Sequence, residues 1–264
     1  MNAQPEPETD LLRADRDGIA WLTLNRPAAR NALSLSLMAA LDAELARIAE
    51  DAAVAVVVLA GAGPAFCAGH DLRELRSRPE RTAYQETFDL CSRLMLRITR
   101  LPKPVIARVH GVATAAGCQL VATCDLAVAA ASARFATPGV NIGLFCSTPM
   151  VALTRAVGRK AAMEMLLTGG LIDAARAREI GLVNQVVADD ALDDAVAALA
   201  GQIAGKSPLT LAIGKEAFYA QAEQGLDAAY RYAAETMTRN MLARDAEEGI
   251  DAFLHRRPPV WTGT

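Results

Sequence analysis

The segment AFCAGHDL, residues 65–72, follows a short β-branched run at 55–60, and HGVATAAGCQ, residues 110–119, follows a second such run at 105–109. Runs of this kind are typical of strands buried on both faces of a parallel sheet. Small residues in both turns let backbone N–H groups approach a ligand, and the second turn opens a helix whose N-terminal dipole favours negative charge. Two such N–H groups aimed at one point would form an oxyanion hole for a thioester enolate; tight strand-to-helix packing is the simpler alternative.

The rest of the chain surrounds these turns with alternating strands and helices. Asp17-Gly18 predicts a hairpin between strands at 11–16 and 19–25, and Ser34 begins a helical pattern. Further predicted elements are a helix at 82–101, a strand at 126–130, helices from 149 onward, a helix at 173–180 ended by Gly181, a strand at 183–187, and a helix opened by Ser207-Pro208. We therefore expect an α/β core over residues 1–200 and an α-helical C-terminal region over 201–264.

Composition excludes several classes of protein. The 264 residues are 52% hydrophobic and 22% charged with a net charge of −3, so the chain can bury a core and lacks the basic surplus of nucleic-acid binders. Its five cysteines form no C-x-x-C pair and its three histidines show no ligand spacing, so we expect reduced thiols and no metal site. Residues 1–10 resemble no targeting segment, and no apolar run reaches the ~18 residues of a membrane span. We expect a cytoplasmic protein with neither a membrane nor a nucleic-acid partner.

Several motifs together resemble one family. They are Leu24-Asn25-Arg26-Pro27 with Asn31-Ala32-Leu33, the 66–72 turn, Lys103 to Ala107, Cys124 to Ala127, Phe135 to Pro138 with Asn141 to Gly143, Ala174 to Val183, and Glu248 to Phe253. In this order they resemble the crotonase (enoyl-CoA hydratase/isomerase) superfamily over nearly the whole chain. Within it, the turn at 68–72, the helix start at 115–120 and the 143–149 loop are similar to the enoyl-CoA hydratase domain-containing protein 3 group.

The resemblance implies a crotonase-like spiral of ββα units, a trimer or dimer of trimers, and an acyl-CoA thioester as ligand, with no cofactor besides the coenzyme A of the substrate. It assigns the backbone N–H groups of His70 and Ala116 as oxyanion donors. It places Arg26, Ala32, Leu33 and Ala68 in the region that holds coenzyme A. It places Phe253 and Arg256 in a C-terminal patch that completes the coenzyme A site, often across a subunit boundary. The His70 imidazole either lines the pocket or is simply a satisfied histidine.

The sequence departs from the family where hydratases carry two glutamates. Gln119 occupies the position of the first and Gly139 that of the second. A glutamine amide has no useful proton equilibrium near neutral pH and glycine has no side chain, whereas each general acid or base contributes about 10²–10⁴ in rate. We therefore expect slow hydration of crotonyl-CoA, which glutamate at both positions would accelerate. Asp71 and Asp125 are the nearest carboxylates in sequence, and we expect structural roles for both.

The region around Cys146 also departs from the family, because Cys146-Ser147-Thr148 replaces a glycine-rich segment that lines the acyl pocket of hydratases. We interpret Cys146 as a buried pocket thiol, since no histidine is obviously placed to activate it as a nucleophile.

Three functions remain open. The first is an enoyl-CoA hydratase-like lyase of fatty acyl-CoA metabolism that uses Gln119 and unrecognised groups. The second is an acyl-CoA decarboxylase, which needs only the oxyanion hole because loss of CO₂ forms the enolate. The third is a non-catalytic acyl-CoA binding protein.

Overall fold

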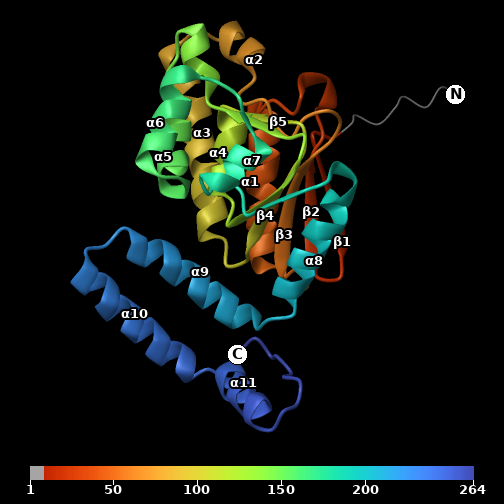
Figure 1. Ribbon diagram of the computed structural model, residues 1–264, viewed down its shortest axis with the longest axis vertical. Coiled ribbons are helices and arrows are strands. Elements are labelled where there is room, and N and C mark those ends of the chain that lie inside the picture. The colour runs from red at the N-terminus through yellow and green to blue at the C-terminus, as the bar shows by residue number, and fades with distance from the viewer. Residues whose placement is uncertain (1–8) are drawn as a thin grey trace, which may run out of the picture.

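The computed structural model describes residues 9–264 as a two-sheet core with a helical C-terminal region that extends away from it (Figure 1). The strands are β1 Leu11–Arg16, β2 Ile19–Leu24, β3 Val56–Gly61, β4 Val105–Val109, β5 Val112–Thr114, β6 Leu126–Ala130, β7 Arg134–Ala136, β8 Ile172–Asp173 and β9 Gln185–Val187. The α-helices are α1 Leu35–Glu50, α2 Leu72–Ser77, α3 Arg81–Arg100, α4 Ala116–Thr123, α5 Ser147–Ala156, α6 Arg159–Thr168, α7 Ala174–Glu179, α8 Leu192–Ala204, α9 Pro208–Ala222, α10 Leu226–Met241 and α11 Arg244–Leu254. Short 3-10 helices lie at Pro27–Ala29, Pro138–Ile142 and Asp189–Ala191.

The large sheet has the order β1-β2-β3-β4-β6-β9, and all its neighbours are parallel except β1 and β2. Asp17 and Gly18 both have positive φ (51° and 75°), as expected at a tight hairpin turn, and this confirms the predicted hairpin. The small sheet has the order β5-β7-β8. Two successive units, β4-β5-α4 and β6-β7-α5, each give one strand to each sheet before a helix, which confirms the ββα spiral.

Both faces of the large sheet are covered. Helices α1, α3 and α4 pack on one face in the main core, whose largest buried side chains include Phe66 and Phe135. Helix α8 packs on the other face, where Leu192 and Val196 meet Val56 and Ile106. Burial on both faces explains why these strands have no polar alternation. The predicted boundary at residue 200 lies within α8, and the chain leaves the core between α8 and α9.

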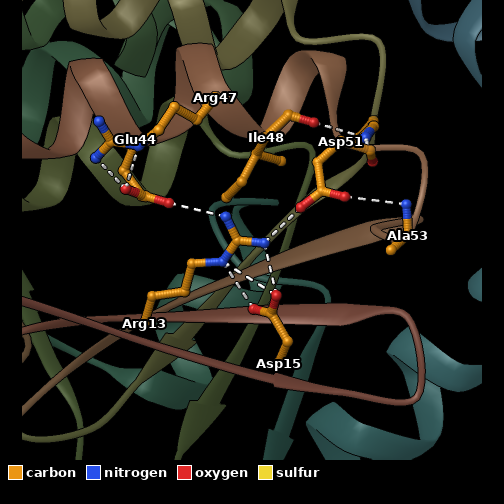
Figure 2. Close-up of polar contacts among 8 residues, drawn as sticks. Arg13, Asp15, Glu44, Arg47, Ile48, Asp51 and Ala53 are labelled. Carbon is orange, nitrogen blue, oxygen red and sulfur yellow. Dashed lines mark hydrogen bonds and ion pairs between the residues drawn. The ribbon is translucent and has the colours of Figure 1, made fainter.

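A charged cluster fixes the edge strand β1 to the end of α1. The Arg13 guanidinium lies between the carboxylates of Asp15, Glu44 and Asp51, with Nη1 2.9 Å from Glu44 and Nη2 2.7 Å from Asp51 (Figure 2). Half-exposed ion pairs contribute little singly, but here one guanidinium joins a strand to a helix over a separation of 38 residues.

Three short strands differ from the sequence expectation. Residues 111–117 were predicted as a turn, yet they contain β5, and β7 and β8 were not predicted at all. Each has two or three residues, too few to show alternation, and each depends on pairing with segments distant in sequence. Within residues 9–264 no single helix is long and apolar enough to cross a membrane. The segments Asp189–Ala204 and Pro208–Ala222, which meet at a bend of 102°, are together long and apolar enough for a membrane span, but only by length and composition.

Candidate functional site

The two turns singled out in the sequence lie against each other at the ends of β3 and β5. The Cys67 N–H donates to Val112 O (3.1 Å), and the Thr114 N–H donates to Cys67 O (3.0 Å). The Thr114 hydroxyl adds a bond to Ala68 O at 3.1 Å. These contacts hold the first turn in register with β5 and the start of α4.

Gly69 lies at a close approach of the two turns. It has a φ of +98°, and a Cβ built on it would lie 2.9 Å from Ala115 Cβ and 3.3 Å from Ala116 N. Any larger residue would push the turns apart. Glycine is therefore required here both by conformation and by the approach of the second turn.

The second turn carries backbone strain. Ala115 has φ 51° and ψ −118°, a region that residues with a Cβ rarely adopt, and its N–H donates to Ala136 O at 2.9 Å. Strain of this kind persists only where surrounding contacts enforce it and is concentrated at functional sites. The conformation turns the chain directly from β5 into α4, so that Ala116 becomes the first residue of the helix.

Two backbone N–H groups at this junction have no acceptor. The parallel bridge between Leu33 and His70 uses the N–H groups of Leu33 and Asp71, which leaves that of His70 outside the ladder. Ala116 is the first residue of α4, where a helix has no internal acceptor for its N–H. Neither group donates a hydrogen bond to any residue in the described range 9–264. The predicted pair of donors thus lies on two contacting turns.

The His70 imidazole is enclosed and neutral. Its ring lies edge-on to Phe88 with centroids 5.5 Å apart, and both ring nitrogens are buried without a partner among residues 9–264. Burial lowers the pKa of His70 to about 4. The two interpretations of this imidazole, a pocket-lining group or a satisfied histidine, stay predictions.

Gln119 is buried in the middle of α4. Its Oε1 lies 3.8 Å from the Cys91 thiol of α3, a weak contact, and the residue is 4% exposed. Its neighbour Cys118 is also buried, and burial raises the pKa of that thiol to about 12. A neutral amide in apolar surroundings can orient a water molecule or a substrate atom but cannot exchange a proton there.

Gly139 leaves no room for a side chain. A Cβ built on it would lie 2.8 Å from Leu144 O and 3.0 Å from Cys146 Sγ, and its own carbonyl accepts the Leu144 N–H at 2.9 Å. The turn at 143–146 therefore fills the space that a second glutamate would need. A glutamate at 139 would have to displace the Leu144 carbonyl, so the expected gain in hydration with glutamate at both positions stays a prediction, and Gln119→Glu alone tests the first position without this obstacle.

Cys146 is buried at the start of α5 and faces Gly139. Burial raises the pKa of its thiol, only partly offset by a hydrogen bond from the Gly139 backbone. This favours a packing thiol over a nucleophile. Nearby, the Thr137 hydroxyl is buried without a partner among residues 9–264, a feature that no pattern in the sequence indicated.

The segment 26–33 is bound to the first turn. Arg26 donates from Nη1 to Ala32 O (2.5 Å) and from Nη2 to Asp71 (3.0 Å). The Leu33 N–H donates to Gly69 O (2.8 Å), and the Ala68 N–H donates to Arg30 O (3.0 Å). Arg26, Ala32, Leu33 and Ala68 thus form one ridge beside the two turns, with much of the Arg26 guanidinium used inside the chain.

Asn31 holds this ridge together, which sequence reasoning did not identify. It is fully buried with φ 54°; its Oδ1 accepts the Arg26 N–H, and its Nδ2 donates to Ala62 O and Ala65 O. The available signal for this role was an asparagine between Arg30 and Ala32, because the short polar side chain of asparagine tolerates the left-handed backbone region.

Both nearby carboxylates serve the structure. Asp71 caps α2 by accepting from Arg73 N and Glu74 N. Burial raises its pKa, but the hydrogen bonds from Arg26 and Glu74 outweigh this effect and hold the pKa below its usual range. Asp125 accepts from Val105 N, Lys215 and Tyr219. The expected structural roles are thus seen in their contacts.

Phe253 lies in the last turn of α11 and Arg256 follows that helix, which belongs to the C-terminal region that extends away from the core (Figure 1). Phe253 is 83% exposed, and Arg256 is exposed with φ 54°. Within one chain they take no part in the ridge formed by Arg26, Ala32, Leu33 and Ala68. In residues 9–264 no group of three or more His, Cys, Asp or Glu side chains is arranged to hold a metal ion.

Comparison with known proteins gives a consistent result. The family model for enoyl-CoA hydratase/isomerase matches residues 14–264. Enoyl-CoA hydratase domain-containing protein 3 from Rattus norvegicus is 46% identical over 261 residues, covering 98% of this chain and 87% of that protein. A crystal structure of enoyl-CoA hydratase from Mycobacterium smegmatis has 55% identity and a TM-score of 0.94, covering 96% of this chain and 99% of that one. The human domain-containing protein 3 structure has 45% identity and a TM-score of 0.93, covering 96% and 100%.

These comparisons confirm the resemblance and correct one expectation. The relatives named domain-containing protein 3 from Rattus norvegicus, Mus musculus, Danio rerio and Homo sapiens all carry the word mitochondrial in their names. The expected cytoplasmic location is therefore contradicted. Its basis was the absence of a targeting pattern in the first ten residues, which is weak evidence about location.

Proposed function

Because the chain belongs to the enoyl-CoA hydratase/isomerase family, in the group of domain-containing protein 3, we propose that it binds an acyl-CoA thioester and polarises the thioester carbonyl with the backbone N–H groups of His70 and Ala116. The observation on which this proposal mainly rests is the pair of N–H groups on two contacting turns that have no acceptor among residues 9–264. Donors fixed by the fold stabilise a developing enolate without reorganisation, which is the source of oxyanion-hole catalysis.

The strained Ala115 supports the same role. Its conformation presents the Ala116 N–H at the start of α4, where the helix dipole adds partial positive charge. Gly69 lets the two turns lie so close that a Cβ at this position would come within 3.3 Å of Ala116 N. An oxygen atom bound at this junction would accept from both turns at once.

Proton transfer is the missing part of a hydratase. Gln119 cannot act as a base, Gly139 has no side chain and no space for one, and Asp71 and Asp125 are engaged in structural hydrogen bonds. We therefore propose a hydratase-like protein in which addition of water to an enoyl thioester is slow. Losing a general acid or base typically lowers the rate by about 10²–10⁴.

The test is hydration of crotonyl-CoA by the wild type, Gln119→Glu and Gln119→Ala. The proposal predicts slow hydration by the wild type, a gain with Gln119→Glu, which installs a carboxylate of nearly the same shape, and tight binding of butyryl-CoA by all three. A brisk wild-type rate that Gln119→Ala abolishes would contradict the proposal.

Decarboxylation is a second candidate, favoured because Asp71 and Asp125, the carboxylates nearest in sequence to the junction, are both held in structural hydrogen bonds. In a malonyl-type thioester the bond from the α-carbon to the carboxylate breaks, CO₂ leaves, and the electron pair enters the enolate that the two N–H groups stabilise; a proton from water then reaches the α-carbon. Methylmalonyl-CoA and ethylmalonyl-CoA should release CO₂ if this holds. No release across the panel, with butyryl-CoA still bound, leaves acyl-CoA binding without catalysis as the function.

Assembly completes the proposal. Large apolar side chains of α9, α10, α11 and the turns that join them are exposed: Phe218, Leu226, Tyr230, Met237, Met241, Leu242, Phe253 and Leu254. So much apolar surface on an extended arm favours contact with further copies. We propose a trimer or dimer of trimers in which Phe253 and Arg256 reach the coenzyme A of a neighbouring subunit, where Arg256 would pair with a phosphate. Light scattering on the purified protein measures the mass, and a monomer would contradict this part.

A further inference from the structure

Lys215 of α9 contacts the C-terminal ends of α3 and α4, the two helices that contribute residues to the candidate site. Its ammonium group donates to Ile98 O in the last turn of α3 at 2.8 Å, to Lys103 O at 2.9 Å, and to Asp125 Oδ2 at 2.6 Å. The side chain is 7% exposed. All three N–H bonds of the ammonium group are therefore used, each on a different part of the core.

The Asp125 carboxylate accepts three hydrogen bonds, as many as the Lys215 ammonium group donates. Its Oδ2 also accepts the Val105 N–H at the start of β4 (2.7 Å), and its Oδ1 accepts the Tyr219 hydroxyl, one helical turn beyond Lys215 on α9 (2.9 Å). Asp125 directly follows Cys124, the C-terminal cap of α4. A buried pair with every hydrogen bond made is a rigid junction, whereas one that lost a partner would leave a buried charge or dipole unpaired.

The two helices whose ends are held by Lys215, α3 and α4, contribute residues to the candidate site from their other turns. Helix α4 begins at Ala116 and carries Gln119. Helix α3 supplies Phe88, which packs on His70, and Cys91, which contacts Gln119. After α8 the chain leaves the core, with α10 beside α9 and α11 in contact with both (Figure 1).

We propose that Lys215 is a positioning residue of the site: it fixes the ends of α3 and α4 relative to each other and so couples the C-terminal helices to the residues around His70 and Gln119. Whether the Lys215 ammonium group is present in this junction therefore determines how α3 packs against the two turns. Lys215 touches no part of the site itself, so its effect passes through the two helices.

The test compares Lys215→Met with Lys206→Met, the same change at an exposed lysine just before α9. Because the chain has only three histidines, His70, His110 and His255, the imidazole NMR signal of His70 reports on the site without any ligand. We expect Lys215→Met to shift the His70 signal while those of His110 and His255 stay in place. We also expect it to weaken butyryl-CoA binding about fivefold or more, a typical size for coupling through packed elements. Lys206→Met should do neither.

A second variant separates positioning from stability. Lys215→Met leaves the largely buried Asp125 carboxylate without its cation, so the variant should lose stability on that account alone. The double variant Lys215→Met/Asp125→Asn removes the charge; the asparagine oxygen still accepts the Val105 N–H, and its NH2 group can donate to the Tyr219 hydroxyl oxygen. It should regain much of the lost thermal stability yet keep the shifted His70 signal, because Ile98 O and Lys103 O are still without a donor. An unshifted His70 signal in the folded double variant would overturn the proposal. The affinity measurement rests on the proposed function and the His70 signal does not, so absent butyryl-CoA binding in the wild type would count against the proposed function only.

Discussion

Replacing Gly139 by alanine tests the account of why the second glutamate is missing. The added methyl group would lie 2.8 Å from Leu144 O and 3.0 Å from Cys146 Sγ. The first of these is a backbone atom that cannot swing aside, and its residue is bonded back to Gly139 by its own N–H. Overpacking of this kind costs about 1–3 kcal/mol, so the midpoint of thermal unfolding should fall by about 2–10 °C for a chain of this size.

The assay is urea and thermal unfolding of Gly139→Ala followed by circular dichroism, with Gly201→Ala as control. Gly201 lies in α8 with open space where its Cβ would be, so alanine there should stabilise by up to about 1 kcal/mol through helix propensity. The two substitutions are chemically identical and should have opposite signs. Equal stability of Gly139→Ala and wild type would show that the 143–146 turn moves freely, and the steric argument against a glutamate at this position would fail.

Three further outcomes are expected. Burial lowers the pKa of His70 to about 4, whereas the unfolded chain takes up this proton near pH 6.5. The free energy of unfolding should therefore fall by up to about 3 kcal/mol as the pH drops from 6.5 to 4. The His70 NMR signal should not titrate above about pH 5, and a titration midpoint near 6.5 would refute this. Asn31→Ala leaves the carbonyls of Ala62 and Ala65 without a hydrogen-bond donor. It should lower the free energy of unfolding in urea by about 2 kcal/mol or more, and a loss of less than about 0.5 kcal/mol would show that the Asn31 amide does not hold this segment together. All five cysteines are buried, so an aromatic disulfide reagent at pH 8 should react slowly with the native protein and with all five thiols after denaturation; one fast native thiol would point to a reactive cysteine.

The sequence indicated those parts of the fold that depend on local signals. Asp17-Gly18 places the hairpin because both residues tolerate positive φ, and Ser34, Asp71 and Ser207 cap the helices that follow them. The apolar runs of β3, β4 and β6 are recognisable since both of their faces are buried. The path of α9 to α11 away from the core was not predictable, because an exposed apolar ridge has the same helical pattern as a buried one.

The site was predictable only where its chemistry lies in the backbone turns. Small residues at 68–69 and 115–117 indicated two close turns, and the structure places them in contact. The closed space at Gly139 was not predictable, because it depends on how the 143–146 turn folds back through the Leu144 N–H. The junction at Lys215 joins residues 90 positions apart, a pairing that no sequence spacing indicates.

The most direct test of the central claim is a crystal structure of the protein with bound butyryl-CoA, a saturated thioester that cannot be hydrated. The account predicts the thioester oxygen at about 2.7–3.1 Å from both His70 N and Ala116 N, with no carboxylate within hydrogen-bond distance of the α- and β-carbons. A thioester oxygen held by a side chain instead, or a carboxylate beside those carbons, would contradict it.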